Sequence, residues 1–217
     1  MWVVLKLNLG YTLVVMTDDN LLTFIFIGRS GCGKGTQSKL LISYLKSNLT
    51  DNVPILHIET GARLREFIEQ DNFSSKKAKA VMVAKELQPS FVPNFIWSKA
   101  LIDEMTGREH IVIDGSPRKL VEAQIMDSAL SFYDRKQTIV VHLNVSRDWS
   151  RERLLARGRL DDDIVGIEKR LDWFEEEVTP VIEFFRNSGH FKYLEVNGED
   201  EIDNVHHNIL VASGLLK

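Results

Sequence analysis

A glycine-rich segment near the N-terminus, residues 28–37 (GRSGCGKGTQ), constrains this chain more than any other feature. It follows the apolar run 21–27, which predicts a strand, and it precedes a helical pattern with apolar residues at Leu40, Leu41 and Leu45. A strand that leads through a glycine-rich turn into a helix points backbone N–H groups and the positive end of the helix dipole at one place. The segment therefore predicts a phosphate-binding loop.

Two side chains of this loop strengthen the prediction. Lys34 can bring a full positive charge to the β and γ oxygens of a nucleotide, and the Thr36 hydroxyl can reach a phosphate or its metal ion. The alternative is a glycine-rich turn without a ligand, but strand, loop, lysine and helix all favour phosphate binding. The spacing departs from the general P-loop, in which Ser or Thr directly follows the lysine, because Gly35 intervenes.

Length and composition narrow the class of protein. A chain of 217 residues is long enough for one sizeable α/β domain, and 44% hydrophobic with 27% charged residues is typical of a soluble globular protein. A net charge of −4 argues against non-specific binding to nucleic acid or to an anionic membrane. Cys32 is the only cysteine, which excludes an internal disulfide and a multi-cysteine zinc site and favours a reducing, cytoplasmic setting.

Residues 1–20 stand apart from the rest of the chain as an N-terminal extension. The first fifteen are largely apolar, yet too short to span a bilayer and without the pattern of a signal peptide. We expect an extra edge strand or a loose tail. Our favoured interpretation is an upstream-extended start, because Met16 would also be a sensible first residue.

The remaining pattern alternates strands with helices, which predicts a three-layer α/β/α fold of the P-loop NTP-hydrolase type with a five-stranded parallel sheet. We expect strands over 22–27, 53–58, 110–113, 138–143 and 192–196. We expect helices over 34–45, 62–70, 75–85, 93–105, 121–130, 146–156, 165–185 and 201–213. Ligands of such sheets gather beyond the carboxyl ends of the strands, so the residues that follow each strand are the candidates for function.

Two of these strand ends carry polar motifs. Residues 59–65 (ETGARLR) place a Thr-Gly turn before a helix with Arg65 on its first turns, although Thr60 could equally be a plain helix cap. Residues 114–118 (DGSPR) place Asp114 at a strand end, where a P-loop fold commonly organises Mg²⁺, and aim Arg118 through a rigid turn. Downstream of a P-loop, the second motif predicts another anion-binding site.

A third cluster is rich in arginine: Arg151, Arg153, Arg157, Arg159 and Arg170. Arg153 and Arg157 are four residues apart and share one face of a helix. The run 157–161 (RGRLD) breaks that helix with a glycine and keeps arginines on either side, which favours a hinged segment that folds over phosphates. A surface helix with many salt bridges is the alternative.

These motifs, in this order, resemble those of the nucleoside monophosphate kinases, and most closely the adenylate kinase family. The family's loop GxPGAGKGTQ is present as GRSGCGKGTQ, its STGDxLR as 59–65 and its DGFPR as 114–118. Its RxDD…RL segment corresponds to 159–162 with 170–171. The resemblance runs from about Leu21 to the C-terminus, and it implies phosphoryl transfer from MgATP to AMP.

The resemblance also implies roles for individual residues. The ATP side would be formed by Gly31, Cys32, Gly33, Lys34, Gly35, Thr36, Arg153 and Arg157. The monophosphate side would be formed by Thr60, Gly61, Arg65, Glu86, Leu87, Gln88, Gly115, Arg118, Glu122, Arg159 and Arg170. The catalytic set would be Lys34, Arg118, Arg157, Arg159 and Arg170, with Asp114 holding Mg²⁺ through water.

Within residues 21–217, the resemblance implies a helical monophosphate-binding arm over 60–91 and a short lid over 157–163 without zinc. Its partners would be ATP and a nucleoside monophosphate, and the family is usually monomeric. The attacking atom is a phosphate oxygen that is already ionised at neutral pH. Arginines, a lysine and Mg²⁺ therefore suffice, and no general base is needed.

Four positions depart from the family pattern: Ser30, Ala62, Ser116 and Glu122. Glu122 matters most because the family has a glutamine there that reads adenine, whereas a carboxylate only accepts hydrogen bonds. A carboxylate would suit guanine or the cytosine amine better, unless Glu122 points aside, is protonated, or leaves base selection to backbone carbonyls. AMP is the favoured acceptor. The alternatives are a GMP, CMP or UMP kinase, and a nucleotide-binding protein that has lost catalysis.

Overall fold

The computed structural model describes residues 2–6, 12–16, 21–48, 53–136, 138–158 and 163–216. Its centre is a parallel sheet with the strand order β4-β5-β3-β6-β7. The strands are β3 (Thr23–Gly28), β4 (Ile55–Glu59), β5 (His110–Asp114), β6 (Thr138–Asn144) and β7 (Phe191–Asn197). The strand that leads into the glycine-rich loop therefore lies in the middle of the sheet, between β5 and β6, where the strand order switches direction.

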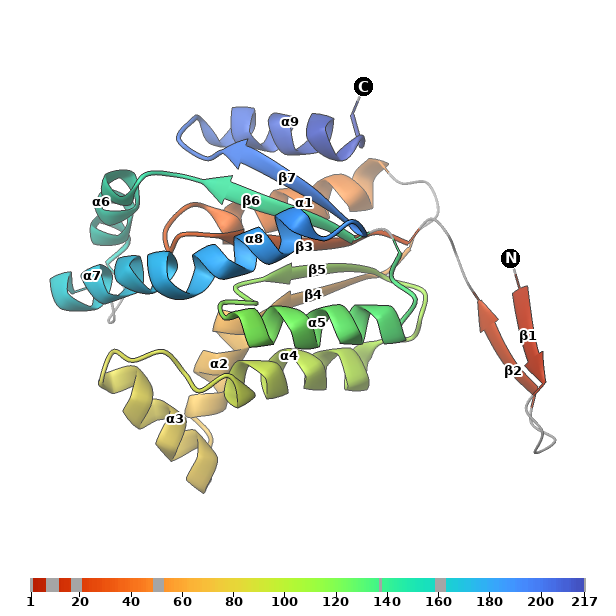
Figure 1. Ribbon diagram of the computed structural model, residues 1–217, viewed down its shortest axis with the longest axis horizontal. Coiled ribbons are helices and arrows are strands. Elements are labelled where there is room, and N and C mark those ends of the chain that lie inside the picture. Colours follow the sequence, from red (N-terminus) through yellow and green to blue (C-terminus); the bar gives the residue numbers. More distant parts are fainter. Residues whose placement is uncertain are drawn as a thin grey trace.

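Helices cover both faces of this sheet (Figure 1). They are α1 (Lys34–Asn48), α2 (Thr60–Ile68), α3 (Phe73–Val83), α4 (Phe91–Glu104), α5 (Leu120–Phe132), α6 (Arg147–Arg157), α7 (Ile164–Trp173), α8 (Thr179–Asn187) and α9 (Ile202–Ser213). The alternation along β3 explains the two cores: Ile25 and Ile27 pack with α4, α5 and α8, whereas Phe24 and Phe26 pack with α1 and α9. The predicted three-layer fold and five-stranded parallel sheet are confirmed.

The long helix expected over 165–185 is interrupted. The chain forms α7, then a π-helical turn η1 (Phe174–Val178), then α8. The N–H of Thr179 bonds to the carbonyl of Phe174, five residues back, and the Thr179 hydroxyl bonds to the same oxygen at 3.2 Å. Pro180 has no N–H to continue the regular ladder, which accounts for the irregular turn before it.

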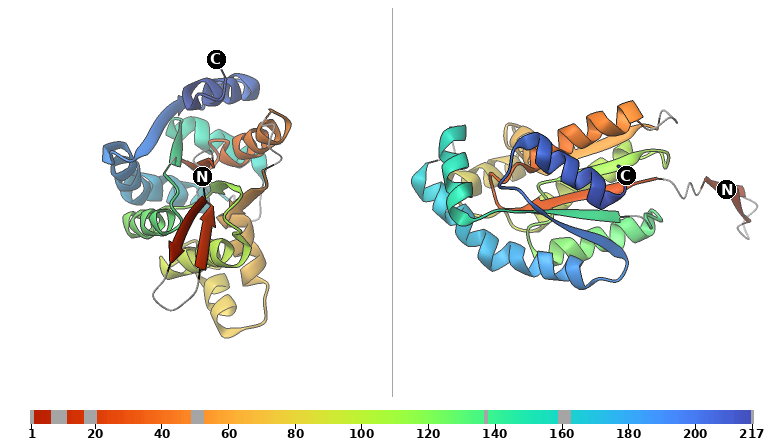
Figure 2. Two further views of the ribbon diagram at one scale, coloured as in Figure 1. Left: turned by 90° about the vertical axis from the view of Figure 1, so that its right-hand side faces the viewer. Right: turned by 90° about the horizontal axis from the view of Figure 1, so that it is seen from above.

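The N-terminal segment forms a hairpin of its own. Strands β1 (Trp2–Lys6) and β2 (Thr12–Met16) pair antiparallel, with Trp2 opposite Met16 (Figures 1 and 2). Neither strand joins the five-stranded sheet, so the edge strand expected from the sequence is not formed. In the part of the chain that the structure describes, no helix is long and apolar enough to cross a membrane.

A buried histidine lies near the end of β6. His142 is 5% exposed, its Nδ1 is 2.8 Å from the hydroxyl of Tyr193, and its ring stacks on Phe174. Burial lowers the pKa of His142 to about 4, and the charges of Arg186, Lys34 and Arg29 act in the same direction. The side chain is therefore neutral in the folded protein at neutral pH, whereas the unfolded chain takes up a proton below about pH 6.5.

This difference makes stability depend on pH. Because the unfolded state binds more protons below pH 6.5, the contribution of His142 to folding is complete above that pH and is lost as the pH falls toward 4. The unfolding free energy of the wild type should decrease between pH 7 and pH 5. In His142→Gln we expect this decrease to be smaller by about 2 kcal/mol. Urea unfolding at several pH values measures it, with His207→Gln, which replaces an exposed histidine, as the control. Equal slopes in all three proteins would contradict the assignment.

Candidate active site

The loop between β3 and α1 is built on glycines that the geometry requires. Gly28 has φ +139°, and a Cβ there would lie 2.6 Å from the carbonyl oxygen of Leu143 on the neighbouring strand. Gly31 and Gly33 also adopt positive φ. Only glycine takes such conformations without strain. The loop can therefore turn sharply at the centre of the sheet and present the N-terminus of α1 to the space beyond the strands.

A cavity of about 550 Å³ opens at this point. The loop and α1 form one wall, and the ends of β4 and β5 form another. Its lining includes Ser30, Gly31, Gly33, Lys34, Gly35, Thr36, Lys39, Glu59, Gly61, Arg65, Asp114, Gly115, Arg118 and Arg157. The structure thus brings residues of the loop, of 59–65 and of 114–118, together with Arg157 of the arginine cluster, into one cavity, as the resemblance implied.

Lys34 is held by its own loop. Its Nζ donates to the carbonyl oxygens of Gly28 at 2.9 Å and Arg29 at 2.7 Å, and it lies 3.4 Å from the Sγ of Cys32. These contacts keep the ammonium group at the base of the loop. The Cys32 side chain is buried beneath the loop and packs with the core on the α1 and α9 side. Cys32 is thus a small packing residue, and its thiol does not face the cavity.

Asp114, at the end of β5, faces the loop. It is almost fully buried, which raises the pKa of its carboxyl group, while the positive charge of Lys34 opposes that shift. A Cβ on Gly35 would lie 3.3 Å from its Oδ2, so the residue after the lysine has little room for a side chain. This crowding gives a physical reason for the extra glycine in the loop.

The oxygens near Asp114 suit magnesium that arrives with a nucleotide. Asp114 supplies a carboxylate and Thr36 a hydroxyl, which are hard oxygen donors, and both line the cavity. Within the described residues, no group of three or more His, Cys, Asp or Glu side chains could hold a metal ion alone. Mg²⁺ commonly needs one or two protein ligands and completes its shell with phosphate and water, so the residues present fit this ion.

Arginines gather on the other side of the cavity. Arg118 donates through Nε to the carbonyl of Gly115 at 3.0 Å, and Arg65 pairs with Glu59 at 3.4 Å. The protein packed around Arg118 and the charges of Arg170 and Arg65 lower the pKa of its guanidinium group, while the charges of Glu122 and Asp114 oppose that shift. A further anion would stabilise three guanidinium groups that repel one another, and the cluster is therefore suited to bind phosphate.

A smaller cavity of about 110 Å³ adjoins Arg118 and Arg170. It lies between the arm and α7, and it is lined by Leu64, Met82, Lys85, Glu86, Leu87, Gln88, Arg118, Gly166, Arg170 and Trp173. The predicted residues Glu86, Leu87 and Gln88 therefore do meet Arg118 and Arg170 in space. The Gln88 Nε2 donates to the carbonyl of Ala78 at 2.8 Å, while its Oε1 is buried with no partner among the described residues.

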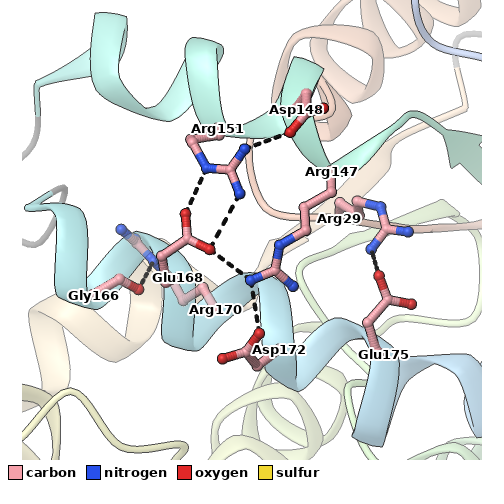
Figure 3. Close-up of polar contacts among 9 residues, drawn as sticks. All are labelled: Arg29, Arg147, Asp148, Arg151, Gly166, Glu168, Arg170, Asp172 and Glu175. Atoms are coloured by element: carbon pink, nitrogen blue, oxygen red, sulfur yellow. Dashed lines mark hydrogen bonds and ion pairs between the residues drawn. The ribbon is translucent and has the colours of Figure 1, made fainter.

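The helices that flank the lid are joined by ion pairs (Figure 3). Arg147 on α6 contacts Glu168 at 2.6 Å and Asp172 at 2.7 Å on α7, and Arg151 contacts the same Glu168 at 2.5 Å. The hydrogen bonds from Arg151 and Arg147 lower the pKa of Glu168 to about 2. For Arg151, the alternative interpretation of a salt-bridged helix surface is therefore correct.

The other arginines of this segment differ in position. Arg157 ends α6 and lines the larger cavity, and Arg170 donates through Nε to the Gly166 carbonyl at 3.1 Å while lining the smaller one (Figure 3). Arg153 stacks on Trp149 with its guanidinium carbon 4.5 Å from the ring centroid. Arg159, and with it residues 159–162 of the expected lid, lies outside the described residues.

Comparison with known proteins decides the family. A family model described as adenylate kinase matches residues 26–190. The adenylate kinase of Corynebacterium urealyticum is 32% identical over 189 residues, which cover 87% of this chain and 97% of the relative. Adenylate kinase 1 of Nostoc is 30% identical over 190 residues, covering 88% and 97%, and the adenylate kinase of Bartonella tribocorum is 32% identical over 181 residues, covering 79% and 90%.

The chain belongs to the adenylate kinase family. It is an ATP-dependent nucleoside monophosphate kinase. The family match begins inside β3, so strands β1 and β2 precede it.

Thr60 has a different place from the helix cap considered as its alternative. It is the first residue of α2, with Glu59 at the cap position, and the Glu59 side chain makes no capping hydrogen bond. The Thr60 hydroxyl is buried without a partner among the described residues. A buried hydroxyl without a partner is unfavourable, so its position next to the cavity residue Gly61 is consistent with the phosphate-binding role that the adenylate kinase motif implies.

The Glu122 side chain caps the start of its own helix. It lies in the first turn of α5, is 2% exposed, and accepts a hydrogen bond from the backbone N–H of Arg118 at 2.8 Å through Oε2. A glutamate that reaches back to the start of its helix is a capping interaction. Burial raises the pKa of this carboxyl group, opposed by the hydrogen bond from Arg118. Glu122 is not among the residues that line the two cavities.

Sequence reasoning missed several residues of the smaller cavity. Leu64, Met82 and Trp173 line it, although Leu64 was not singled out within the motif 59–65 and no motif contains Met82 or Trp173. Trp173 follows Arg170 by three residues on the same helix, so its position on the same face as a predicted site residue was the available signal. Leu64 and Met82 looked like ordinary apolar residues of the arm, and only the packing of α2 and α3 places them at the site.

Proposed function

We propose that this enzyme transfers the terminal phosphoryl group of MgATP reversibly to AMP, giving two ADP. The supporting observation is the single cavity in which Lys34 and the loop face Arg65, Arg118 and Arg157 beside Asp114. Such a site can bind two sets of phosphates and neutralise the charge between them. Because the attacking phosphate oxygen is already ionised, positioning and charge neutralisation are sufficient for the reaction.

The donor would bind on the loop side. Backbone N–H groups of residues 31–36 and the N-terminus of α1 would hold the ATP phosphates, with Lys34 moving from its loop carbonyls to the transferred group. Arg157 would contact the same phosphates, and Arg153 would pack on the adenine of ATP. Mg²⁺, when bound with ATP, would supply positive charge near Asp114 and Thr36.

The acceptor would bind opposite. Thr60, Arg65 and Arg118 would hold the phosphate of the monophosphate, and residues 86–88 would line its base pocket. Arg170, and Arg159 with it, would neutralise the charge between donor and acceptor. The Gln88 Oε1, which lacks a partner among the described residues, would accept a hydrogen bond from the adenine amino group.

We propose two moving parts, the arm over 60–91 and the short lid over 157–163, which would close over the substrates and exclude water. Two ion pairs join the arm to the lid side in this structure: Lys85 to Asp163 at 2.8 Å and Glu86 to Lys169 at 2.6 Å. Both are partly exposed, so each would hold the parts together only weakly and allow opening. We further infer a monomer in the cytoplasm, with residues 1–20 as an extension outside the kinase domain and its reaction.

The acceptor base can be tested directly. We expect AMP to exceed GMP, CMP and UMP in kcat/KM by at least about tenfold, because Glu122 is occupied by its helix cap and leaves the base to other groups. A coupled assay of ADP formation with each monophosphate measures this. Glu122→Gln should keep the same order of acceptors. If GMP or CMP has a higher kcat/KM than AMP, the enzyme is a kinase for that nucleotide instead.

A further inference from the structure

Arg29, the second residue of the loop, makes contacts that play no part in the phosphate binding proposed for the loop. Its side chain is only 15% exposed. Its Nε donates to the carbonyl oxygen of Val145 at 2.9 Å, and its Nη1 is 2.5 Å from Oε1 of Glu175 (Figure 3). Its guanidinium carbon lies 4.0 Å from the centroid of the Phe174 ring. Arg29 is not among the residues that line the two cavities, so it has no direct route to the substrates.

These contacts join three separate elements. Val145 directly follows β6, while Phe174 and Glu175 form the start of the π-helical turn η1. That turn continues α7, the helix that carries Arg170. Arg29 therefore connects the loop with the helix that brings an arginine to the acceptor side.

The backbone of Arg29 completes the connection. Its carbonyl oxygen accepts a hydrogen bond from Lys34 at 2.7 Å. Phe174, against which Arg29 stacks, lines a small cavity with Gly28, Lys34 and Arg170. One residue thus lies between the lysine of the donor side and the arginine of the acceptor side. The π-helical turn is the irregular place where α7 meets this contact, and such turns are frequent at functional sites.

We propose that Arg29 is a positioning residue that sets the loop bearing Lys34 against the helix bearing Arg170. In-line phosphoryl transfer depends strongly on such placement, since displacements near 1 Å can cost about 100-fold in rate. The planar guanidinium suits the role because it can stack on Phe174 and pair with Glu175 at the same time. The adenylate kinase pattern GxPGAGKGTQ leaves this position open, so the pattern itself assigns no role to the arginine. The inference rests on the enzyme's phosphoryl transfer and holds for any acceptor base.

Arg29→Met keeps the length of the side chain and removes its charge. We expect kcat to fall about 10-fold to 100-fold, with KM for ATP and for the monophosphate within about twofold of wild type. Arg29→Lys should keep part of kcat, because the lysine ammonium group can still pair with Glu175. Glu175→Gln should cause a smaller loss, and the Arg29→Met/Glu175→Gln double variant should be no slower than Arg29→Met alone.

The matched control is Arg186→Met on α8. Arg186 also pairs with glutamates, Glu183 and Glu195, but it does not contact the loop. Its kcat should stay at the wild-type value. All proteins are assayed well below the onset of unfolding, as measured for each variant by circular dichroism.

Three results would overturn the proposal: a higher KM for ATP with unchanged kcat, wild-type kinetics in Arg29→Met, or an equal loss in Arg186→Met. The first would mean direct contact with ATP, and the others a structural role only. A wild-type enzyme without turnover on any monophosphate would instead refute the activity itself, so the two failures are distinct.

Discussion

Lys34→Met should lower kcat by at least about 10²- to 10³-fold, the largest effect of any single substitution that we propose. The lysine carries the full positive charge of the loop, and its Nζ lies within 3 Å of two loop carbonyls, poised at the phosphate site. Methionine keeps the length and apolar character of the stem but cannot compensate charge that develops on the transferred phosphoryl group. Steady-state turnover with saturating ATP and monophosphate measures the loss.

A control variant and unfolding measurements distinguish a loss of catalysis in Lys34→Met from a loss of folding. Lys46→Met on the same helix, α1, replaces an exposed lysine and should keep wild-type turnover. Both variants should unfold with free energies close to that of wild type, because neither lysine belongs to the core. Turnover at the wild-type level in Lys34→Met would contradict the proposed activity, because it would show that the measured turnover came from a contaminating kinase.

Arg118→Met should be the second most damaging change. We expect KM for the monophosphate to rise at least about tenfold and kcat to fall about 10²-fold, since Arg118 can bind the acceptor phosphate before and during transfer. The charges of Arg65 and Arg170 repel its guanidinium and are opposed in part by Glu122 and Asp114, so a bound anion would stabilise the group further. KM for ATP should change much less. Initial rates over a grid of both substrate concentrations separate these constants.

The shape of the side chain provides a sharper test. Arg118→Lys keeps the charge but loses the planar fork that pairs with two phosphate oxygens, so we expect it to restore only a small part of the activity. Arg108→Met, which replaces an exposed arginine in the turn before β5, should behave like wild type. A rise in KM for ATP alone would move Arg118 to the donor side and contradict the proposed division of the cavity.

Much of the fold follows from local patterns. Short apolar runs alternating with amphipathic helices predict a parallel sheet between two helical layers, and the strands and helices begin and end within a few residues of their expected places. Two parts of the fold differ from the expectation, and each has a physical reason. The π-helical turn before Pro180 is five residues long and is flanked directly by α7 and α8, so the sequence over 165–185 indicates one continuous helix. Strands β1 and β2 have strand-forming composition, but their pairing partners cannot be read from composition.

Some residues of the candidate site could be predicted from the sequence, and others could not. The glycine-rich loop, Asp114 and Arg118 stand at strand ends, and parallel strands bring their carboxyl ends to one edge of the sheet. Met82 and Arg29 could not be predicted, because their importance comes from contacts with residues distant in sequence. Glu122 shows the opposite case. Its chemistry suggested a base-reading role, but in the structure it accepts a hydrogen bond from the backbone N–H of Arg118, just before its own helix.

By itself, the sequence determined the chemistry available to this protein: glycines that let a loop close around phosphate, a lysine and arginines to neutralise it, and an aspartate suited to magnesium. These features can be read from the spacing and type of the side chains, because they depend only on residues that are neighbours along the chain. Only the tertiary structure decided which of those groups meet. It gathered Lys34, Asp114 and Arg118 around one cavity, assigned Glu122 to a helix cap and joined Arg29 to a turn more than a hundred residues away. Such contacts depend on how the layers pack, and no local pattern encodes that packing.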